Sequence, residues 1–105
     1  MAELCNIDWH ITPFRADRWL ELWEPVAARM PAFGAKSWTL TRSIDDPLAF
    51  RQSAVWESRD DFERYWYSEE IATLREAALN YYNKPVAASW HTLAIDASPV
   101  STEAG

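Results

Sequence analysis

The 105-residue sequence has little of several features on which whole classes of protein depend. Its single cysteine, Cys5, cannot form an internal disulfide, and no spacing of cysteine and histidine matches a zinc site. The ten basic residues are scattered and the net charge is −6, so nucleic-acid binding is not expected. No apolar run approaches about 18 residues, and no basic region precedes an apolar one at the N-terminus. We therefore expect a cytoplasmic protein without a membrane segment.

Aromatic residues, in contrast, are abundant. Seven Trp, four Tyr and four Phe occur in a chain that has room for one domain and a modest core. Two interpretations stay open: some rings line a pocket or a subunit interface, or the core is simply built from large side chains.

The most informative stretch runs from Phe50 to Trp66. From Phe50 to Glu57 two sets of residues alternate, which is the period of a strand: one set is Phe50, Gln52, Ala54 and Trp56, and the other is Arg51, Ser53, Val55 and Glu57. Ser58 then stands at a helix N-cap position, with Asp61 three residues later as in a capping box. The sequence thus predicts a buried strand that leads directly into an amphipathic helix.

The same criteria applied to the whole chain predict strands at about 3–12, 36–43, 50–57 and 87–95. One helix is expected between the first two strands, with a kink or restart near Glu24 because Pro25 follows. The other helical region starts at Ser58 and is expected to break at Ser68, a second possible N-cap. The order β-α-β-β-α-β predicts an α+β, ferredoxin-like fold with a four-stranded antiparallel sheet. We expect a single domain over residues 1–95 and a flexible C-terminal tail over 96–105.

In such a fold both helices cover the same face of the sheet, so the other face is bare. Both faces of the first strand carry residues that favour burial, among them Leu4 on one side and Trp9 and Ile11 on the other. We therefore expect a homodimer through the open sheet face.

A resemblance to a known family rests on the same central stretch. The run Val55-Trp56-Glu57-Ser58, then Phe62 and then Trp66-Tyr67-Ser68-Glu69, resembles the dimeric α+β barrel superfamily and, within it, the antibiotic biosynthesis monooxygenase (ABM)-like branch. That branch includes cofactor-independent oxygenases that convert phenolic or anthrone-type polyketides to quinones. It also includes haem-degrading enzymes and many small proteins without an established role.

The resemblance implies a substrate pocket between the sheet and the helices. Trp56 fits the strand-end tryptophan that lines the pocket of the oxygenases, Gln52 stands where they carry an Asn, and Phe62 stands where they carry a Tyr hydroxyl. The predicted substrate-binding residues, which would line this pocket around a small aromatic ligand, are Gln52, Trp56, Phe62, Tyr65 and Trp66.

The match to the haem-degrading enzymes is also partial. Asn6 fits an asparagine of the first strand, but Tyr65 occupies the position of a helical tryptophan and Arg75 that of the axial histidine. Haem binding would then depend on His10 or His91 as a replacement ligand, and we expect no cofactor and no metal.

The predicted catalytic residues are Asn6, Asp8 and His10, which recur at every second position and so share one face of the first strand. The resemblance implies that this face looks into the pocket. Imidazole accepts protons near neutral pH, so His10 could deprotonate a phenol for direct reaction with oxygen, with Asp8 or Asn6 orienting it. The alternative is a solvated or interface-facing set of polar residues.

Three functions therefore stay open, and the sequence does not decide whether the protein is an enzyme. The first is a cofactor-independent monooxygenase acting on a small aromatic or polyketide-like substrate. The second is a non-catalytic small-ligand-binding or structural dimer, and the third is haem binding or degradation. The face of the first strand on which His10 lies would discriminate between the first two.

Overall fold

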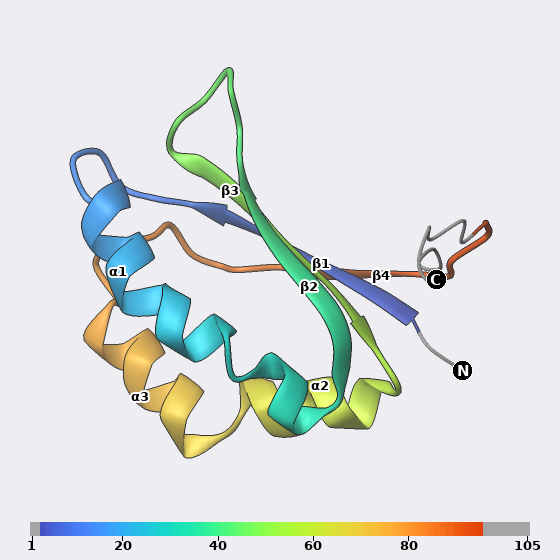
Figure 1. Cartoon of the computed structure of the whole chain (residues 1–105). Coiled ribbons are helices and arrows are strands. Elements are labelled where there is room, and N and C mark those ends of the chain that lie inside the picture. Colours follow the sequence, from blue (N-terminus) through green and yellow to red (C-terminus); the bar gives the residue numbers. More distant parts are fainter. Residues whose placement is uncertain (1–2, 96–105) are drawn as a thin grey trace, which may run out of the picture.

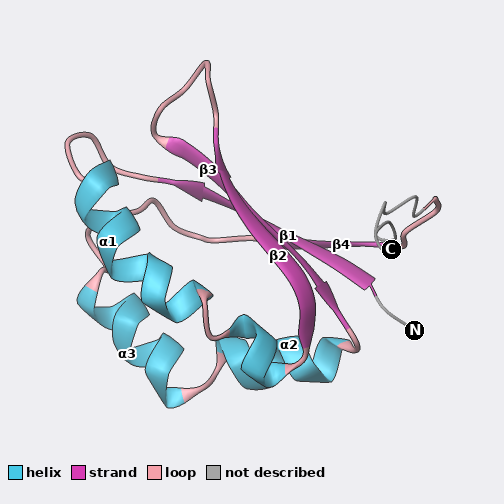
Figure 2. Cartoon of the chain, viewed as in Figure 1, coloured by secondary structure: helices cyan, strands magenta, loops and turns pink. Residues whose placement is uncertain are grey.

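The computed structural model describes residues 3–95 of the chain. Its strands and helices form two layers, a twisted sheet and a layer of helices beneath it (Figures 1 and 2). In chain order the elements are β1 (Glu3–His10), α1 (Ala16–Ala27), the 3₁₀ turn η1 (Met30–Phe33), β2 (Ala35–Arg42), β3 (Ala49–Trp56), α2 (Arg59–Trp66), α3 (Glu69–Ala77) and β4 (Ala88–His91). The predicted ferredoxin-like fold is confirmed, and the predicted tail at 96–105 lies outside the described residues.

The sheet has the strand order β2-β3-β1-β4, and all neighbouring strands are antiparallel. The two central strands pair along their whole length, from Glu3 opposite Trp56 to His10 opposite Ala49. On the other side of β1, Leu4 lies opposite His91 of β4. Because the first and last strands are neighbours, residues from both ends of the chain meet on one surface.

Alternation along β1 gives the sheet two very different faces. Cys5, Ile7 and Trp9 are at most 2% exposed, whereas Asp8 and His10 between and beyond them are exposed. All three helices lie on one side of the sheet, so the buried set faces them and the opposite face has no cover from the described chain (Figure 1). We call these the helix-covered face and the open face.

The helix starts follow the predicted caps. The hydroxyl of Ser58 accepts a hydrogen bond from the backbone N–H of Asp61, and α2 begins at the next residue. The hydroxyl of Ser68 accepts from the N–H of Ile71, so the helical region breaks there as predicted and α3 begins. This break adds a third helix to the two that the fold class requires.

Two expectations about element ends were wrong. Of the kink or restart expected near Glu24, the restart does not occur: the first helix continues through Pro25 to Ala27. The last strand ends at His91 rather than at residue 95, where its pairing with β1 stops.

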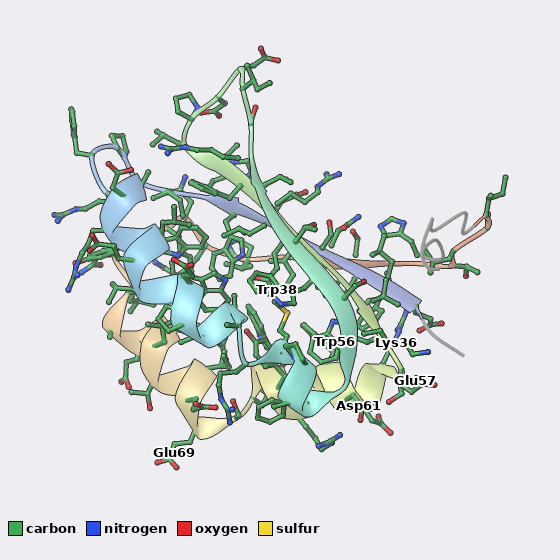
Figure 3. The ribbon with its side chains drawn as sticks, viewed as in Figure 1. Lys36, Trp38, Trp56, Glu57, Asp61 and Glu69 are labelled. Atoms are coloured by element: carbon green, nitrogen blue, oxygen red, sulfur yellow. The ribbon has the colours of Figure 1, made fainter. Side chains whose placement is uncertain are left out.

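Gly34 joins the helical layer to β2. Its φ of +118° is a left-handed conformation, and an added Cβ would lie 2.6 Å from a carboxylate oxygen of Asp61. At the same end of the sheet, Lys36 and Glu57 form an ion pair of 3.1 Å (Figure 3). This corner fixes α2 against the start of β2.

Candidate functional site

The predicted catalytic residues lie on the open face, away from the helices. Asp8 accepts from Arg51 of β3 at 2.8 and 3.3 Å, and Asn6 accepts from the Ser53 hydroxyl at 2.6 Å. The hydrogen bond from Arg51 lowers the pKa of Asp8 below its ordinary value. Both groups are thus engaged with β3, and neither contacts the space between sheet and helices.

The expectation that this face looks into a pocket beneath the helices was wrong. The reason is burial, because the alternate residues Cys5, Ile7 and Trp9 are apolar and remove more apolar surface from water. His10 is exposed, beside a hollow of about 430 Å³ at the Asp8–Arg51 end of the open face. The catalytic role of Asn6, Asp8 and His10 stays a prediction, but it would have to be exercised on this face.

His91 lies on the same open face, at its other end. It is exposed and lies 3.0 Å from the hydroxyl of Ser89, its neighbour on that side of β4. Both histidines of the chain are therefore on the side of the sheet that the helices do not cover.

The predicted substrate-binding residues lie on the helix-covered face, and four of the five touch one another. The Trp56 ring centroid is 5.5 Å from those of both Phe62 and Tyr65, and Phe62 stacks on Trp66 at 5.7 Å. Burial raises the pKa of Tyr65, whose hydroxyl donates to the Val26 carbonyl. This tyrosine is therefore a structural member of the core.

Gln52 stands apart from these four rings. Its amide oxygen accepts from the Trp23 indole N–H at 2.8 Å, and its amide nitrogen lies 3.5 Å from the sulfur of Met30. The Gln52 side chain is 2% exposed, and within residues 3–95 it is the one polar side chain buried in the core. Because both ends of the amide already contact buried groups, few of its donors and acceptors remain for a ligand.

Large rings fill the space between the sheet and the helices. The Trp9 ring lies at the centre, 5.3 Å from Trp19, 4.8 Å from Trp23 and 5.0 Å from Tyr82. Trp9, Trp19, Trp23 and Trp56 are each 1% exposed. The aromatic residues thus form the core, and among residues 3–95 a ligand would meet this cluster at its edge.

At that edge, two adjoining hollows form what we call the α2–β4 groove. One, of about 170 Å³, is lined by Ile7, Phe62, Trp66, Tyr67, Val86 and Ala88. The other, of about 400 Å³, is lined by Trp66, Ala72, Arg75, Glu76, Leu79, Tyr82, Lys84 and Val86. The two share Trp66 and Val86, so the half-buried Trp66 ring forms a common wall.

The larger hollow carries the polar groups of the groove. The Arg75 guanidinium lies 4.6 Å from the Trp66 ring centroid, and its Nη2 donates to the Trp66 carbonyl at 3.3 Å. Burial raises the pKa of Tyr82, and the nearby Arg75 opposes that rise. Within residues 3–95, no three His, Cys, Asp or Glu side chains converge as a metal site would require.

No protein-family model and no curated protein matches the sequence. Solved structures match closely in shape. SnoaB from Streptomyces nogalater, a cofactor-independent oxygenase, superposes with a TM-score of 0.77 over 91% of this chain and 96% of its own, at 15% identity. Rv0793 from Mycobacterium tuberculosis superposes with a TM-score of 0.79 over 93% of this chain and 100% of its own, at 17% identity. A candidate antibiotic biosynthesis monooxygenase from Nitrosomonas europaea superposes with a TM-score of 0.78 over 86% of this chain and 88% of its own, at 13% identity.

The chain has the fold of the antibiotic biosynthesis monooxygenase proteins. The resemblance based on residues 50–70 is therefore confirmed for the fold. Among residues 3–95, none of the helices is long and apolar enough to span a bilayer.

Within this monooxygenase fold, sequence reasoning missed part of the groove. The sequence places Arg75 only at the position of an axial histidine, and no motif points to Lys84 or Val86. These residues come from α3 and from the segment before β4, and their meeting depends on how that segment crosses the sheet edge. Trp66, the wall between the two hollows, is the one predicted site residue that lines both.

Proposed function

We propose that this protein binds a small aromatic molecule in the α2–β4 groove. The observation that carries the proposal is the stacked Phe62–Trp66 pair, which forms the border between the aromatic core and the smaller hollow. The pair offers a ligand ring an apolar surface for stacking or edge contacts. A mostly apolar concavity with a few polar groups at one end is the usual form of a small-molecule site.

Binding without catalysis is the function that the geometry supports best. The imidazoles lie on the open face, across the sheet from the groove, so neither can take a proton from a ligand held there. The polar side chains that line the groove in their place are those of Tyr67, Arg75, Glu76, Tyr82 and Lys84. Haem binding through a strand histidine is disfavoured for the same reason.

Cofactor-independent oxygenation of the bound aromatic is the second candidate function. It is favoured by Arg75, because a guanidinium beside a phenol would stabilise the phenolate that reacts with oxygen. SnoaB, which has the same fold, is itself named an oxygenase of this kind.

We also propose that two copies pair through the open face. The polar groups at its centre are satisfied within the chain by the Asp8–Arg51 ion pair and the Ser53–Asn6 hydrogen bond. A second copy of the same negative net charge would therefore meet compensated side chains rather than free carboxylates. Leu4 and Val55, both half-buried, supply apolar contact on this face.

The binding proposal is tested by calorimetric titration with 2-naphthol and 2-naphthamide. We expect Trp66→Ala to weaken binding about tenfold or more, because the stacking wall is lost. Trp38→Ala is the matched control: Trp38 is also half-buried but lies on β2 (Figure 3). The hollow beside it is a different one. Equal losses in the two variants, or no binding of either probe by the wild type, would contradict a ligand site in the groove.

The pairing proposal is tested by sedimentation velocity. Val55→Asp places one carboxylate from each copy at the expected interface, and we expect the dimer to weaken about tenfold or more. Thr73→Asp, on the exposed surface of α3, is the control and should leave association unchanged. A wild type that sediments as a monomer at high concentration would refute the pairing.

Oxygen consumption distinguishes the two candidate functions. If the protein only binds, adding 2-naphthol or another electron-rich phenol to it leaves the oxygen concentration constant. Consumption that is abolished by Trp66→Ala would instead establish the oxygenase.

A further inference from the structure

The distribution of ion pairs singles out the groove. All ten lysines and arginines lie within residues 3–95, and there seven of them form ion pairs with a carboxylate: Arg18, Arg29, Lys36, Arg42, Arg51, Arg59 and Arg64. The other three are Arg15, Arg75 and Lys84. Arg75 and Lys84 both line the larger hollow of the α2–β4 groove. In a chain with more acids than bases, two cations without a carboxylate partner in the described structure converge on one site.

Within residues 3–95, the groups that hold the two cations in place are all neutral. Arg75 lies over the Trp66 ring and donates to the Trp66 carbonyl, while its Nε is inaccessible and has no partner in the described chain. Lys84 donates to the carbonyls of Leu79 and Tyr82 and lies 5.1 Å from the Tyr82 ring centroid. Carbonyls and ring faces orient a cation without cancelling its charge, so both positive charges are available to a ligand.

Glu76 is the acid in the lining of this hollow. Against it stand two cations, so the described lining carries a net positive charge on a protein whose total charge is −6. The apolar end of the groove, around Phe62 and Val86, adjoins this positive end through Trp66. A molecule that spans the groove would therefore place a ring at one end and negative charge at the other.

We infer that the ligand is an aromatic carboxylate, whose ring lies against Phe62 and Trp66 and whose carboxylate pairs with Arg75 and Lys84. The inference rests on the proposed aromatic site and states which class of aromatic ligand that site prefers. A guanidinium presents parallel N–H donors that match the two oxygens of a carboxylate. Because Arg75 is already ordered against Trp66, little side-chain freedom remains to be lost when it binds. Arg75 and Lys84 are thus assigned as specificity-determining residues.

The test compares two probes of equal size that differ in charge, naphthalene-2-carboxylate and 2-naphthamide, by calorimetric titration. We expect the wild type to bind the carboxylate about tenfold or more tightly than the amide. Arg75→Gln should remove most of this preference and leave amide binding nearly unchanged, and Arg75→Lys should restore part of it. Arg15→Gln, which removes an unpaired cation stacked on Tyr81 outside the groove, should change neither affinity.

Salt provides a readout that needs no variant. Raising the ionic strength should weaken carboxylate binding and leave amide binding unchanged, because only the former depends on charge attraction. Lys84→Gln, at an exposed position, serves as a second variant if Arg75→Gln does not fold, and should reduce the preference about threefold.

The possible outcomes separate the two proposals. Equal affinities of the two probes for the wild type would overturn the carboxylate assignment while leaving the aromatic site intact. Binding of neither probe would overturn the aromatic site itself. A preference that survives both Arg75→Gln and Lys84→Gln would show that other groups select the anion, and would also overturn the assignment.

Discussion

The two faces of the sheet are built from the same strands but by opposite chemistry. On the helix-covered face, four tryptophans are each 1% exposed, and the buried amide of Gln52 accepts from the indole of one of them, Trp23. On the open face, the same strands present the Asp8–Arg51 ion pair, the Ser53–Asn6 hydrogen bond and both histidines. Polar residues with catalytic potential and aromatic residues with binding potential are therefore separated by the thickness of the sheet. A function that needs a polar catalytic group beside an aromatic binding surface must therefore take its polar group from the groove, or act across the sheet.

Thiol reactivity should show the largest contrast between the faces. Burial raises the pKa of the Cys5 thiol to about 12, and the side chain is 2% exposed on the helix-covered face. At pH 8 we expect it to react with a disulfide reagent at least about a thousandfold more slowly than an exposed thiol. Thr73→Cys adds such a thiol on the exposed surface of α3, away from the core and from the proposed dimer contact, so this variant should show one fast and one slow reaction. Fast labelling of native wild type would contradict the assignment of faces.

Truncation of the central ring should show the next largest effect. We expect Trp9→Ala to lower the free energy of unfolding by about 3–5 kcal/mol, because it leaves a cavity among Trp19, Trp23 and Tyr82. Urea unfolding measures the change. Thr39→Ala on the open face should change stability by less than about 0.5 kcal/mol. Similar losses at the two positions would mean that the faces do not differ in burial as described.

The buried amide provides a sharper test of the helix-covered face. Gln52→Leu removes the acceptor of the Trp23 indole N–H, and leaving that donor buried and unpaired should cost about 1–3 kcal/mol. Adding Trp23→Phe removes the unpaired donor, so the double variant should lose less than the sum of the single changes. Strict additivity in urea unfolding would exclude the coupling.

The smallest effect is expected for the ion pair of the open face. In the single chain the side chains of Asp8 and Arg51 are 53% and 57% exposed, so solvent screens the pair. At concentrations low enough to keep the copies apart, Asp8→Asn should therefore cost at most about 1 kcal/mol at neutral pH. The folded-state pKa of Asp8 lies below the ordinary 3.8, so the stabilisation is fully present above 3.8. It is lost as the pH falls through the lowered value, where wild type and Asp8→Asn should become equally stable. A stability difference that grows toward acid would contradict this.

The sequence was sufficient for the fold because local signals agreed with one another. Alternation placed Phe50 to Trp56 in a strand, and the hydroxyls of Ser58 and Ser68 set the helix starts where the caps were predicted. The end of the last strand could not be predicted in this way, because it depends on how far β4 pairs with β1.

The candidate site was predicted only in part. The rings of Trp56, Phe62, Tyr65 and Trp66 do come together, but the resemblance turned Asn6, Asp8 and His10 toward the wrong side of the sheet. The signal that would have corrected this was present, since Cys5, Ile7 and Trp9 form the more apolar alternate set of β1. The convergence of Arg75 and Lys84 depends on tertiary structure and has no local signal.

The packing of the tryptophans also has an optical consequence. Trp66 lies 6.1 Å from Trp9 and 6.3 Å from Trp23, and Trp9 lies 5.3 Å from Trp19, all far inside the range over which excited indoles exchange energy. Light absorbed anywhere in this set therefore migrates among all its members, including the half-buried Trp66 at the groove. Emission from the whole set should thus respond to whatever occupies the groove, so that the protein carries its own spectroscopic probe for the ligand.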